Sequence, residues 1–476
     1  MRKAMIFTLL FLIVSVSTAC WSAFHIYESR DDIVLVENTI MGDKAQAEGL
    51  TTTLTNTYRD RLFWNTTYTL YTTPETTYTY SAQELTYNEE YDYSGITLTS
   101  YPDFGMSEAI CAPGYRTGMN LAGMELFNSL APGEEKEAEI YLKDYYEYYP
   151  ISVWIDFPNM NNYLGETFLV DESRMTPNTD HYVMVKLRDY FKIPISTEDC
   201  YRIQVSKDLD GNLGENGMLL ISKDCFQMQS TSILMSDACY FLFDAHSFAG
   251  NLVDTSLLPD GFGIFCLPYE AYRKSSVPYD LFDIKVDELD MVYPLNPEIH
   301  ILNFTTDTSN SHFLLHTLEN EVHYLTIIDI KTMETVQKIE LSGLSASDEY
   351  TLLQDAETKA ILFWGHNTLG ILALAETGQY QLEFICDIPF YPTDYFRSGY
   401  LDFSYNGTQL AVGWIDNYSE KPDFHVTIFD DTGLTYFGKY ENSLHTYTPN
   451  DIPGLDYICR PYGESPLQIT WTNHEN

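Results

Sequence analysis

Basic residues are scarce in this sequence. The chain has 476 residues, of which 26 are lysine or arginine and 69 are acidic, so the formal net charge is −43. No cluster of lysine or arginine interrupts this acidic background. Because such a surface repels phosphate backbones, we expect no nucleic-acid partner. The acids are spread along the chain and not gathered in a tail, which predicts a solvated acidic surface.

The sequence also lacks the linear signatures of common enzyme classes. No HExxH, GxSxG, P-loop or dinucleotide-binding glycine pattern occurs, and each of these supports its chemistry through a fixed spacing. We therefore expect no cofactor and no metal site, and the sequence points to no catalytic residue. Carboxylates from separate repeats can still meet in space without a linear motif, so an active site built in that way stays open.

Cysteine is sparse, with 8 residues in the chain, which is too few for a scaffold built on disulfides. Cys225, Cys239 and Cys266 lie in strand-like runs without a CxxC or Cys/His spacing, so we expect buried free thiols and no zinc site. The DLDGN stretch at residues 208–212 begins like a calcium-binding loop. It has Leu213 where that loop needs glycine, so we expect only a tight turn.

Aromatic residues, in contrast, are abundant. They make up 15% of the chain, with 38 tyrosines and 26 phenylalanines, and together with many threonines they favour sheet over helix. The length exceeds what one hydrophobic core usually serves. The expected fold class is mainly β, with more than one folded unit.

The N-terminus carries the longest apolar run. Residues 4–24 contain no charge and follow Arg2 and Lys3; about 20 apolar residues span a membrane, and the basic flank places the N-terminus in the cytoplasm. The run predicts an uncleaved single-pass signal anchor or a cleaved signal peptide. Ser17 to Cys20 also resembles the lipobox of bacterial lipoproteins, which implies possible lipidation of Cys20. Each alternative exports the chain, so we expect a cell-membrane protein, single-pass or lipid-anchored, with its bulk extracytoplasmic.

Composition divides the chain into four segments. Residues 1–24 are the signal anchor or signal peptide, and residues 25–50 are expected to form a stalk. Residues 51–215 form a Tyr/Thr-rich antiparallel β region, either a sandwich or early propeller blades, in which 181–195 is expected to be a strand. Residues 216–476 form a repeat domain.

A repeated hairpin defines that last domain. The strand–corner–strand run from His323 to Leu341 recurs around Thr377 and Thr432, and its corner threonine repeats at spacings of 45 and 55 residues. Each copy is preceded by two more strand-like runs, so the unit is four-stranded. A looser fourth unit is expected within residues 217–295, beginning with the run GMLLIS.

The segment LDFSYNGTQLAVGW, from Leu401 to Trp414, resembles the Ser-x-Asp-Gly-x-x-Leu-Ala corner of WD40-like and YVTN-like β-propellers. The segment LTIIDIKTMETVQKIEL is similar to their outer hairpin. The resemblance implies a C-terminal propeller of four-stranded blades and brings no catalytic residue with it. Because a propeller closes its ring, we expect either that C-terminal strands pair with a segment before residue 216 or that N-terminal strands supply extra blades.

Single histidines and tryptophans give no site. His312 and His316 would share one strand face about 13 Å apart, too far to hold one metal, so we expect packed or solvated side chains. Trp364, Trp414 and Trp471 fall in strands, where packing inside a blade is expected.

The leading hypothesis is a membrane-anchored, extracytoplasmic, non-enzymatic protein whose propeller binds an unknown protein or glycan partner. One alternative is an exported hydrolase that acts on glycans or peptides through carboxylates in the propeller channel. A further alternative is a sensor or accessory subunit of an envelope complex.

Overall fold

The structure is a computed structural model of the chain. It describes residues 2–29, 35–58, 62–69, 75–80, 95–99, 118–144, 147–149, 151–156, 164–166, 183, 186–187, 189–197, 199–223, 226, 228–247, 250–273, 280–389, 401–415, 423–442, 460–461 and 466–471.

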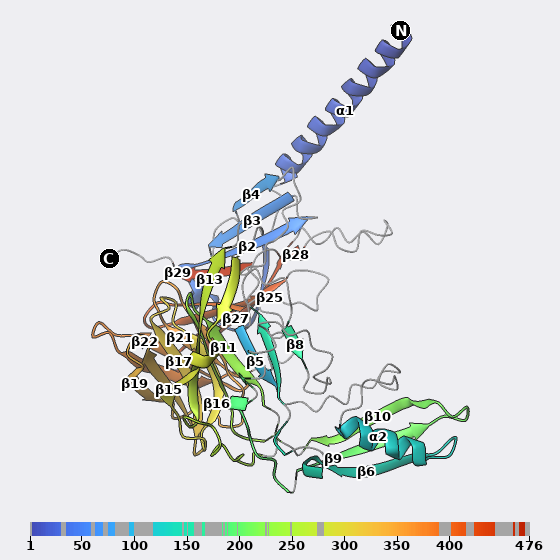
Figure 1. Cartoon of the computed structure of the whole chain (residues 1–476). Coiled ribbons are helices and arrows are strands. Elements are labelled where there is room, and N and C mark those ends of the chain that lie inside the picture. The colour runs from blue at the N-terminus through green and yellow to red at the C-terminus, as the bar shows by residue number, and fades with distance from the viewer. Residues whose placement is uncertain are drawn as a thin grey trace. The chain divides into compact units, whose positions relative to one another are not determined.

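The chain folds into two compact units that are not consecutive in sequence. Unit 1 contains residues 1–91 and 343–476, and unit 2 contains residues 92–342. Both are built mainly from antiparallel sheets, and among the described residues each contains one four-stranded sheet of the kind found in propeller blades. This confirms the predicted mainly β fold class (Figure 1). The sequence analysis divided the chain into four continuous segments, and the boundaries of those segments stay a prediction.

Unit 1 holds three sheets and the N-terminal helix. The strand orders are β20-β21-β22-β23, β1-β27-β26-β25-β24 and β28-β2-β3-β4, with β29 also pairing with β2. The elements are α1 (Arg2–Ser29), β1 (Leu35–Gly42), the short 3-10 helix η2 (Lys44–Ala47), β2 (Leu50–Tyr58), β3 (Leu62–Thr69), β4 (Glu75–Tyr80), β20 (Thr351–Gln354), β21 (Ile361–Trp364), β22 (Thr368–Leu374), β23 (Tyr380–Asp387), β24 (Leu401–Tyr405), β25 (Leu410–Ile415), β26 (Phe424–Asp430), β27 (Gly433–Asn442), β28 (Arg460–Pro461) and β29 (Leu467–Trp471).

Among its described residues, unit 2 contains four sheets and the α-helix α2. The strand orders are β5-β7-β8, β10-β9-β6, β16-β17-β18-β19 and β11-β12-β13-β14, with β15 also pairing with β13. The elements are β5 (Gly95–Thr99), α2 (Gly118–Ser129), β6 (Glu135–Tyr141), η4 (Leu142–Asp144), β7 (Ser152–Asp156), β8 (Leu164–Glu166), β9 (Cys200–Lys207), β10 (Leu213–Lys223), β11 (Ser230–Leu234), β12 (Ala238–Phe243), β13 (Gly263–Arg273), β14 (Asp280–Ile284), η6 (Val286–Glu288), β15 (Asp290–Pro294), β16 (His300–Thr306), β17 (His312–Glu319), β18 (Val322–Asp329) and β19 (Glu334–Glu340).

The three clear repeats of the sequence correspond to three four-stranded sets, β16–β19, β20–β23 and β24–β27. Their corners share a backbone conformation. Met333, Gly378 and Gly433 all have positive φ, of 53°, 79° and 112°, which turns the chain sharply between the last two strands of each set. Asp329 Oδ1 accepts hydrogen bonds from the backbone of Thr332 and its neighbour, so side-chain bonding holds even the corner without glycine.

The looser fourth repeat is present but begins later than expected. Its sheet starts at β11, whereas the predicted first strand, GMLLIS, belongs to β10 and pairs with β9 in another sheet. GMLLIS has four consecutive apolar residues and no alternation, so its sequence does not specify a partner strand, and only its pairing with β9 decides its place.

The strand expected at residues 181–195 is wrong in its first part. The described residues from Val183 to Tyr190 are helical, and the backbone N–H of Phe191 donates to the carbonyl of Leu187 at 3.0 Å. Val183, Leu187 and Phe191 are buried in one core. Their spacing of four places them on one helical face, and this periodicity decides against the strand.

Of the two alternatives that the sequence left open, the structure shows the pairing of a C-terminal strand with a segment before residue 216. In unit 1, β29 pairs with β2, with Leu54 opposite Leu467. Asp402 Oδ2 also accepts a hydrogen bond from the backbone N–H of Ile469 at 2.8 Å. Burial raises the pKa of Asp402 to about 6, although this bond and another backbone bond oppose the shift.

Residues 35–50, which were expected within the stalk, are part of a sheet and its core. β1 adds to β27 along the sheet edge, and Ala47 and Leu50 are fully buried among apolar side chains from β25, β26 and β27. Among the residues whose side chains are described, no helix combines the length and the apolar character needed to cross a membrane.

Candidate functional site

The structure tests several residues that the sequence singled out. Cys20 is exposed on α1 as a free thiol, and Cys239 is a buried free thiol as predicted; Cys225 lies outside the described residues. Asp208 to Asn212 forms the predicted tight turn, in which the backbone N–H of Asn212 donates to Asp208 Oδ1 at 2.7 Å.

The two histidines of β17 have different surroundings. His312 is half-buried, and its Nδ1 lies 3.1 Å from Asp307 Oδ2. His316 is fully buried, and its Nε2 lies 3.0 Å from Nδ1 of His323 on β18. Burial, with a smaller effect of His323, lowers the pKa of His316 to about 3. Both histidines are packed or solvated, as the sequence predicted.

The tryptophans of the repeats are packing residues. Trp364 and Trp414 are buried, with ring centroids 6.3 Å apart. Trp471 is half-buried against the core of unit 1, and its indole Nε1–H donates to the carbonyl of Ser404 at 3.2 Å. These contacts confirm the expected packing role inside the sheets.

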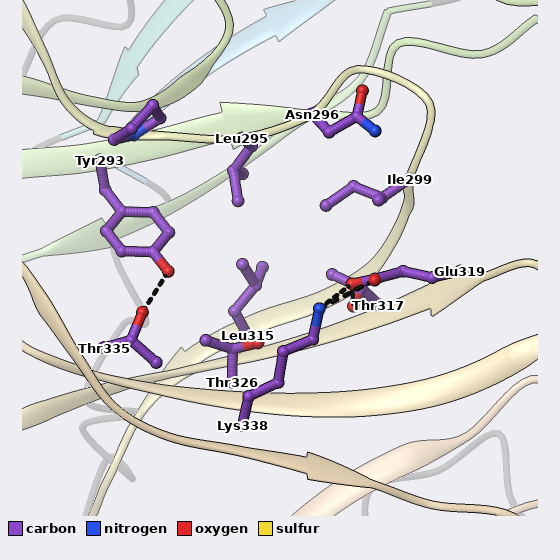
Figure 2. Close-up of a pocket in the computed structure, with 11 residues that line it drawn as sticks. Tyr293, Leu295, Asn296, Ile299, Leu315, Thr317, Glu319, Thr326, Thr335 and Lys338 are labelled. Atoms are coloured by element: carbon purple, nitrogen blue, oxygen red, sulfur yellow. Dashed lines mark hydrogen bonds and ion pairs between the residues drawn. The ribbon is translucent and has the colours of Figure 1, made fainter.

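A cavity of about 240 Å³ lies in unit 2, lined by β15, the turn that follows it, and one face of the β16–β19 sheet (Figure 2). Leu315, Thr326 and Lys338 are register partners on β17, β18 and β19, so they form one row across that face. Deeper on the same face, the sheet packs through Phe313 and Ile328 into an apolar core shared with the β11–β15 sheet. The cavity therefore lies at the edge of this apolar core, where polar side chains replace apolar ones on the same sheet face.

The cavity combines an apolar wall with paired polar groups. Leu295 and Ile299 lie across from Leu315 in Figure 2. The Lys338 ammonium donates to both carboxylate oxygens of Glu319, at 2.7 and 2.8 Å, and lies 4.6 Å from the centre of the Tyr324 ring.

On the other side of the cavity, the Tyr293 and Thr335 hydroxyls share a hydrogen bond of 2.6 Å. The lining thus offers hydroxyl groups, one ammonium, one carboxylate and a flat aromatic ring. This mixture suits a small ligand that has both apolar C–H surface and hydroxyl groups.

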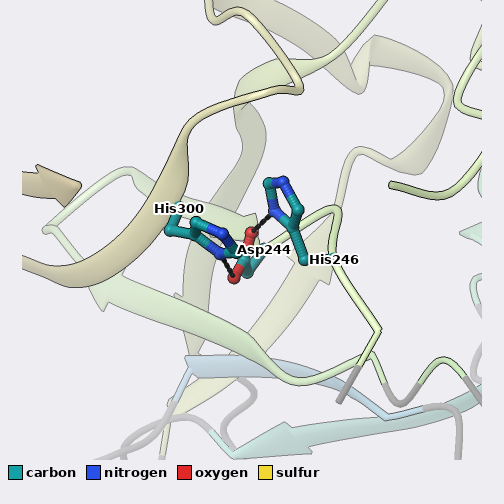
Figure 3. Close-up of side chains that lie close together, drawn as sticks. All are labelled: Asp244, His246 and His300. Atoms are coloured by element: carbon teal, nitrogen blue, oxygen red, sulfur yellow. Dashed lines mark hydrogen bonds and ion pairs between the residues drawn. The ribbon is translucent and has the colours of Figure 1, made fainter. Parts of the chain in front are cut away.

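A second cluster in unit 2 joins Asp244, His246 and His300 (Figure 3). Nδ1 of His246 lies 2.7 Å from Asp244 Oδ1, and Nδ1 of His300 lies 3.3 Å from Asp244 Oδ2. The two imidazole rings stack with their centroids 3.6 Å apart. One ligand atom from each of the three residues lies within 4.8 Å of the others, so this cluster could hold a metal ion.

Sequence reasoning missed all three residues of this cluster. Asp244 and His246 are two residues apart, which is a weak signal for one strand face. His300 follows 54 residues after His246, and nothing local indicates that it returns to the same place.

The comparisons with known proteins give a likeness in fold only. No protein-family model and no curated protein matches the sequence. Solved structures that match include the Cps50 (Swd1) β-propeller domain of Myceliophteria thermophila, which is 11% identical over 51% of this chain and 68% of its own, with a TM-score of 0.24.

Two other matches cover more of the chain. The periplasmic gluconolactonase of Pseudomonas aeruginosa is 10% identical over 82% of this chain and 96% of its own, with a TM-score of 0.29. The oligogalacturonate lyase of Vibrio parahaemolyticus is 8% identical over 87% and 98%, with a TM-score of 0.28. At these identities and scores, the activities of those proteins say nothing about this chain. Its own antiparallel sheets are consistent with propeller blades.

Proposed function

We propose that this protein is an anchored, extracytoplasmic binding protein of β-propeller type, and that the cavity of Figure 2 holds a sugar residue of a glycan. The observation that carries the proposal is the lining of that cavity, in which an apolar wall faces hydroxyl groups and an ion pair. A volume of about 240 Å³ lies below the range of about 300–1,000 Å³ that is typical for drug-sized ligands. It suits a ligand of roughly one sugar ring.

Each part of the lining has a counterpart on a sugar. The C–H face of a pyranose packs against aromatic and aliphatic surface, which Tyr293 and Leu295 supply. Sugar hydroxyls both donate and accept hydrogen bonds, as the hydroxyl groups of Tyr293 and Thr335 do. Lys338 and Glu319 give one charged donor and one charged acceptor within 2.7 Å of each other, so the pair can bind a neutral hydroxyl-rich ligand without leaving a net charge.

Removing the aromatic ring is expected to abolish most of the binding. We expect neutral monosaccharides in a screening panel to show saturation-transfer signals with the wild-type chain. Tyr293→Ala and Lys338→Met should each weaken binding about 5- to 30-fold, because each removes a contact worth roughly 1–2 kcal/mol. Lys331→Gln is the matched control, since Lys331 is an exposed lysine on the corner of the same sheet.

Two outcomes of this experiment would contradict the proposal. One is that no sugar of the panel binds the wild-type chain. The other is that Tyr293→Ala and Lys338→Met bind as tightly as Lys331→Gln does. If an oligosaccharide offered in place of the monosaccharides is cleaved during the measurement, the chain is a glycan-cleaving enzyme and not only a binding protein.

The anchor in this proposal is α1. Its apolar side chains are exposed over the described part from Ile6 to Phe24, for example Phe7 at 72%, Phe11 at 67% and Val14 at 61%. Apolar surface costs about 25 cal/mol for each Å² left in water. A lipid phase removes that cost, and the basic residues Arg2 and Lys3 keep the N-terminus on the cytoplasmic side.

Deletion of residues 2–29 is expected to move the protein from the membrane fraction to the soluble fraction. Intact mass spectrometry of the membrane-extracted protein then separates the forms of attachment: retention of the first 19 residues shows a signal anchor, and a lipid on Cys20 shows a lipoprotein. Cys20→Ala is the control, because it releases only a lipid-anchored chain. Recovery of the full-length chain in the soluble fraction would contradict the anchor.

A further inference from the structure

We propose that Asp244, His246 and His300 form a binding site for one divalent transition metal of the zinc class, with a coordination position open to solvent or ligand. The three residues form the Asp–His–His cluster shown in Figure 3. Two imidazole nitrogens and one carboxylate oxygen are a ligand set that zinc and its neighbours in the first transition row accept. Calcium and magnesium prefer oxygen ligands throughout.

The chain holds the first two ligands on one short, bonded segment. Asp244 follows directly after β12, and His246 forms an antiparallel bridge with Leu252. The backbone N–H of Val253 donates to the carbonyl of Ala245 at 2.9 Å. Residues two apart in extended chain point to the same side, so this pairing directs both side chains toward one point.

The third ligand arrives from the start of β16. His300 follows a turn in which the backbone N–H of Ile299 donates to the carbonyl of Asn296 at 3.2 Å. This turn places His300 beside Asp244. The His300 ring then lies against the His246 ring, with 29° between the planes. In Figure 3, both rings direct a nitrogen at the single carboxylate of Asp244. The turn and the strand pairing thus bring together Asp244 and His300, which are 56 residues apart in the sequence.

The separations in the cluster are close to those of a metal site. Bonds of about 2.0–2.2 Å from a tetrahedral zinc ion place neighbouring ligand atoms roughly 3.3–3.5 Å apart. The two nitrogen–oxygen separations are 2.7 and 3.3 Å. Metal entry therefore needs the closer pair, His246 and Asp244, to separate by roughly 0.6–0.8 Å. It also needs ring rotations that turn the nitrogen lone pairs from parallel stacking toward one ion.

The protons of the two histidines do not prevent metal binding. A carboxylate oxygen can only accept, so Nδ1–H of each ring is the donor in the hydrogen-bonded arrangement, which leaves Nε2 as the other ring nitrogen. When an ion is bound through Nδ1, that proton moves to Nε2 by exchange with water, and each ring stays neutral. Asp244 contributes one negative charge, which partly compensates the divalent ion.

The solvent exposure of the three side chains indicates that the fourth coordination position of the metal is open. The His246 side chain is 7% exposed, which anchors one ligand in the protein, whereas those of Asp244 and His300 are 33% and 37% exposed. Three protein ligands with access to solvent are the arrangement of zinc sites that bind water or substrate, while structural zinc sites use four protein ligands. The net charge of −43 also raises the concentration of cations near the surface.

The test is a metal titration of the full chain in detergent after removal of metals with a chelator. Zinc chloride is added in an excess of magnesium, which occupies the scattered carboxylates, and heat is recorded by calorimetry. One tight site per chain is expected, and His300→Asn and Asp244→Asn should each weaken it about 100-fold or more, beyond the 10–100-fold typical of lost supporting contacts. Cobalt in place of zinc should give visible absorption bands of a low-symmetry site, and these bands should be lost in both variants.

His312→Asn is the matched control, because His312 lies 3.1 Å from Asp307 in a half-buried pair. Among the described residues, this pair is not part of a group of three ligand atoms within 4.8 Å of one another. This variant should bind zinc like the wild type. Thermal unfolding without metal checks that the variants fold, and zinc should raise the melting temperature of the wild type and not of His300→Asn.

Two results would overturn the metal site. The wild-type chain could bind no zinc when magnesium is in excess, in which case the cluster is only a hydrogen-bonded group. Alternatively, the cluster variants could bind zinc as the wild type does, in which case the ion sits elsewhere. Tyr293→Ala and Lys338→Met leave the cluster intact, so loss of sugar binding in those variants says nothing against the metal site.

Discussion

Lys439→Met is expected to lower the free energy of unfolding by about 3–5 kcal/mol, because it leaves a buried carboxylate without its cation. Asp423 precedes β26, and its side chain is only 3% exposed. The Lys439 ammonium on β27 lies 2.9 Å from it and 3.2 Å from Glu441. Burial alone would lower the pKa of Lys439, but the bonds to these two carboxylates outweigh burial, and the net shift is upward. The lysine is therefore charged at neutral pH.

Urea unfolding at neutral pH measures this loss, and Lys338→Met is the matched control. Lys338 makes an ion pair of 2.7 Å with Glu319 in unit 2, but the two side chains are 43% and 21% exposed. Exposed pairs contribute about 0–1 kcal/mol. Adding Asp423→Asn to Lys439→Met should recover part of the loss, because no buried charge is then left. Equal losses for Lys439→Met and Lys338→Met would show that the burial of Asp423 does not matter.

The wild-type protein should lose stability on acidification below about pH 6.5, partly because of His316. Its pKa of about 3 in the folded protein compares with about 6.5 for an unfolded chain. Between these values, the unfolded state binds a proton that the folded state does not. Stability therefore falls with falling pH, by up to about 1.4 kcal/mol per pH unit from this group, and the fall stops near the folded pKa.

His316→Leu removes this titration and isolates its contribution. The change in unfolding free energy between about pH 7 and about pH 4.5 should be smaller in the variant by roughly 2–3 kcal/mol. The comparison uses the pH dependence and not the stability at one pH, because the variant also loses the 3.0 Å contact with His323. Identical pH dependences for the two proteins would mean that His316 does not remain neutral in the folded state.

Local patterns predicted the repeat sheets well, for a physical reason. Each set of four strands is closed by short turns, and strand alternation places Phe313 and Leu315 toward one core. Both signals lie within a few residues of each other, so the sequence carries them without knowledge of the rest of the fold. The prediction of the first strand of the fourth repeat was wrong, because the sequence GMLLIS does not specify which neighbouring strand it pairs with.

The candidate sites depended on contacts that sequence spacing does not encode. The cavity lies between β15 and the β16–β19 sheet, so its shape depends on how two sheets pack and not on either alone. The Asp–His–His cluster needs His300 to return beside Asp244. The sequence prediction of no metal site rested on close spacings, and such spacings cannot reveal side chains that meet from separate strands.

By itself, the sequence determined the mainly β class, the four-stranded repeats, the acidic surface and the apolar N-terminal run, because composition and short-range periodicity specify them directly. Only the tertiary structure decided that β1 pairs with β27 and β29 with β2. It also decided that His316 is buried beside His323 and that Asp244, His246 and His300 meet. These features arise from strand pairing and sheet packing between distant segments, and one chain read in order contains no local signal for them.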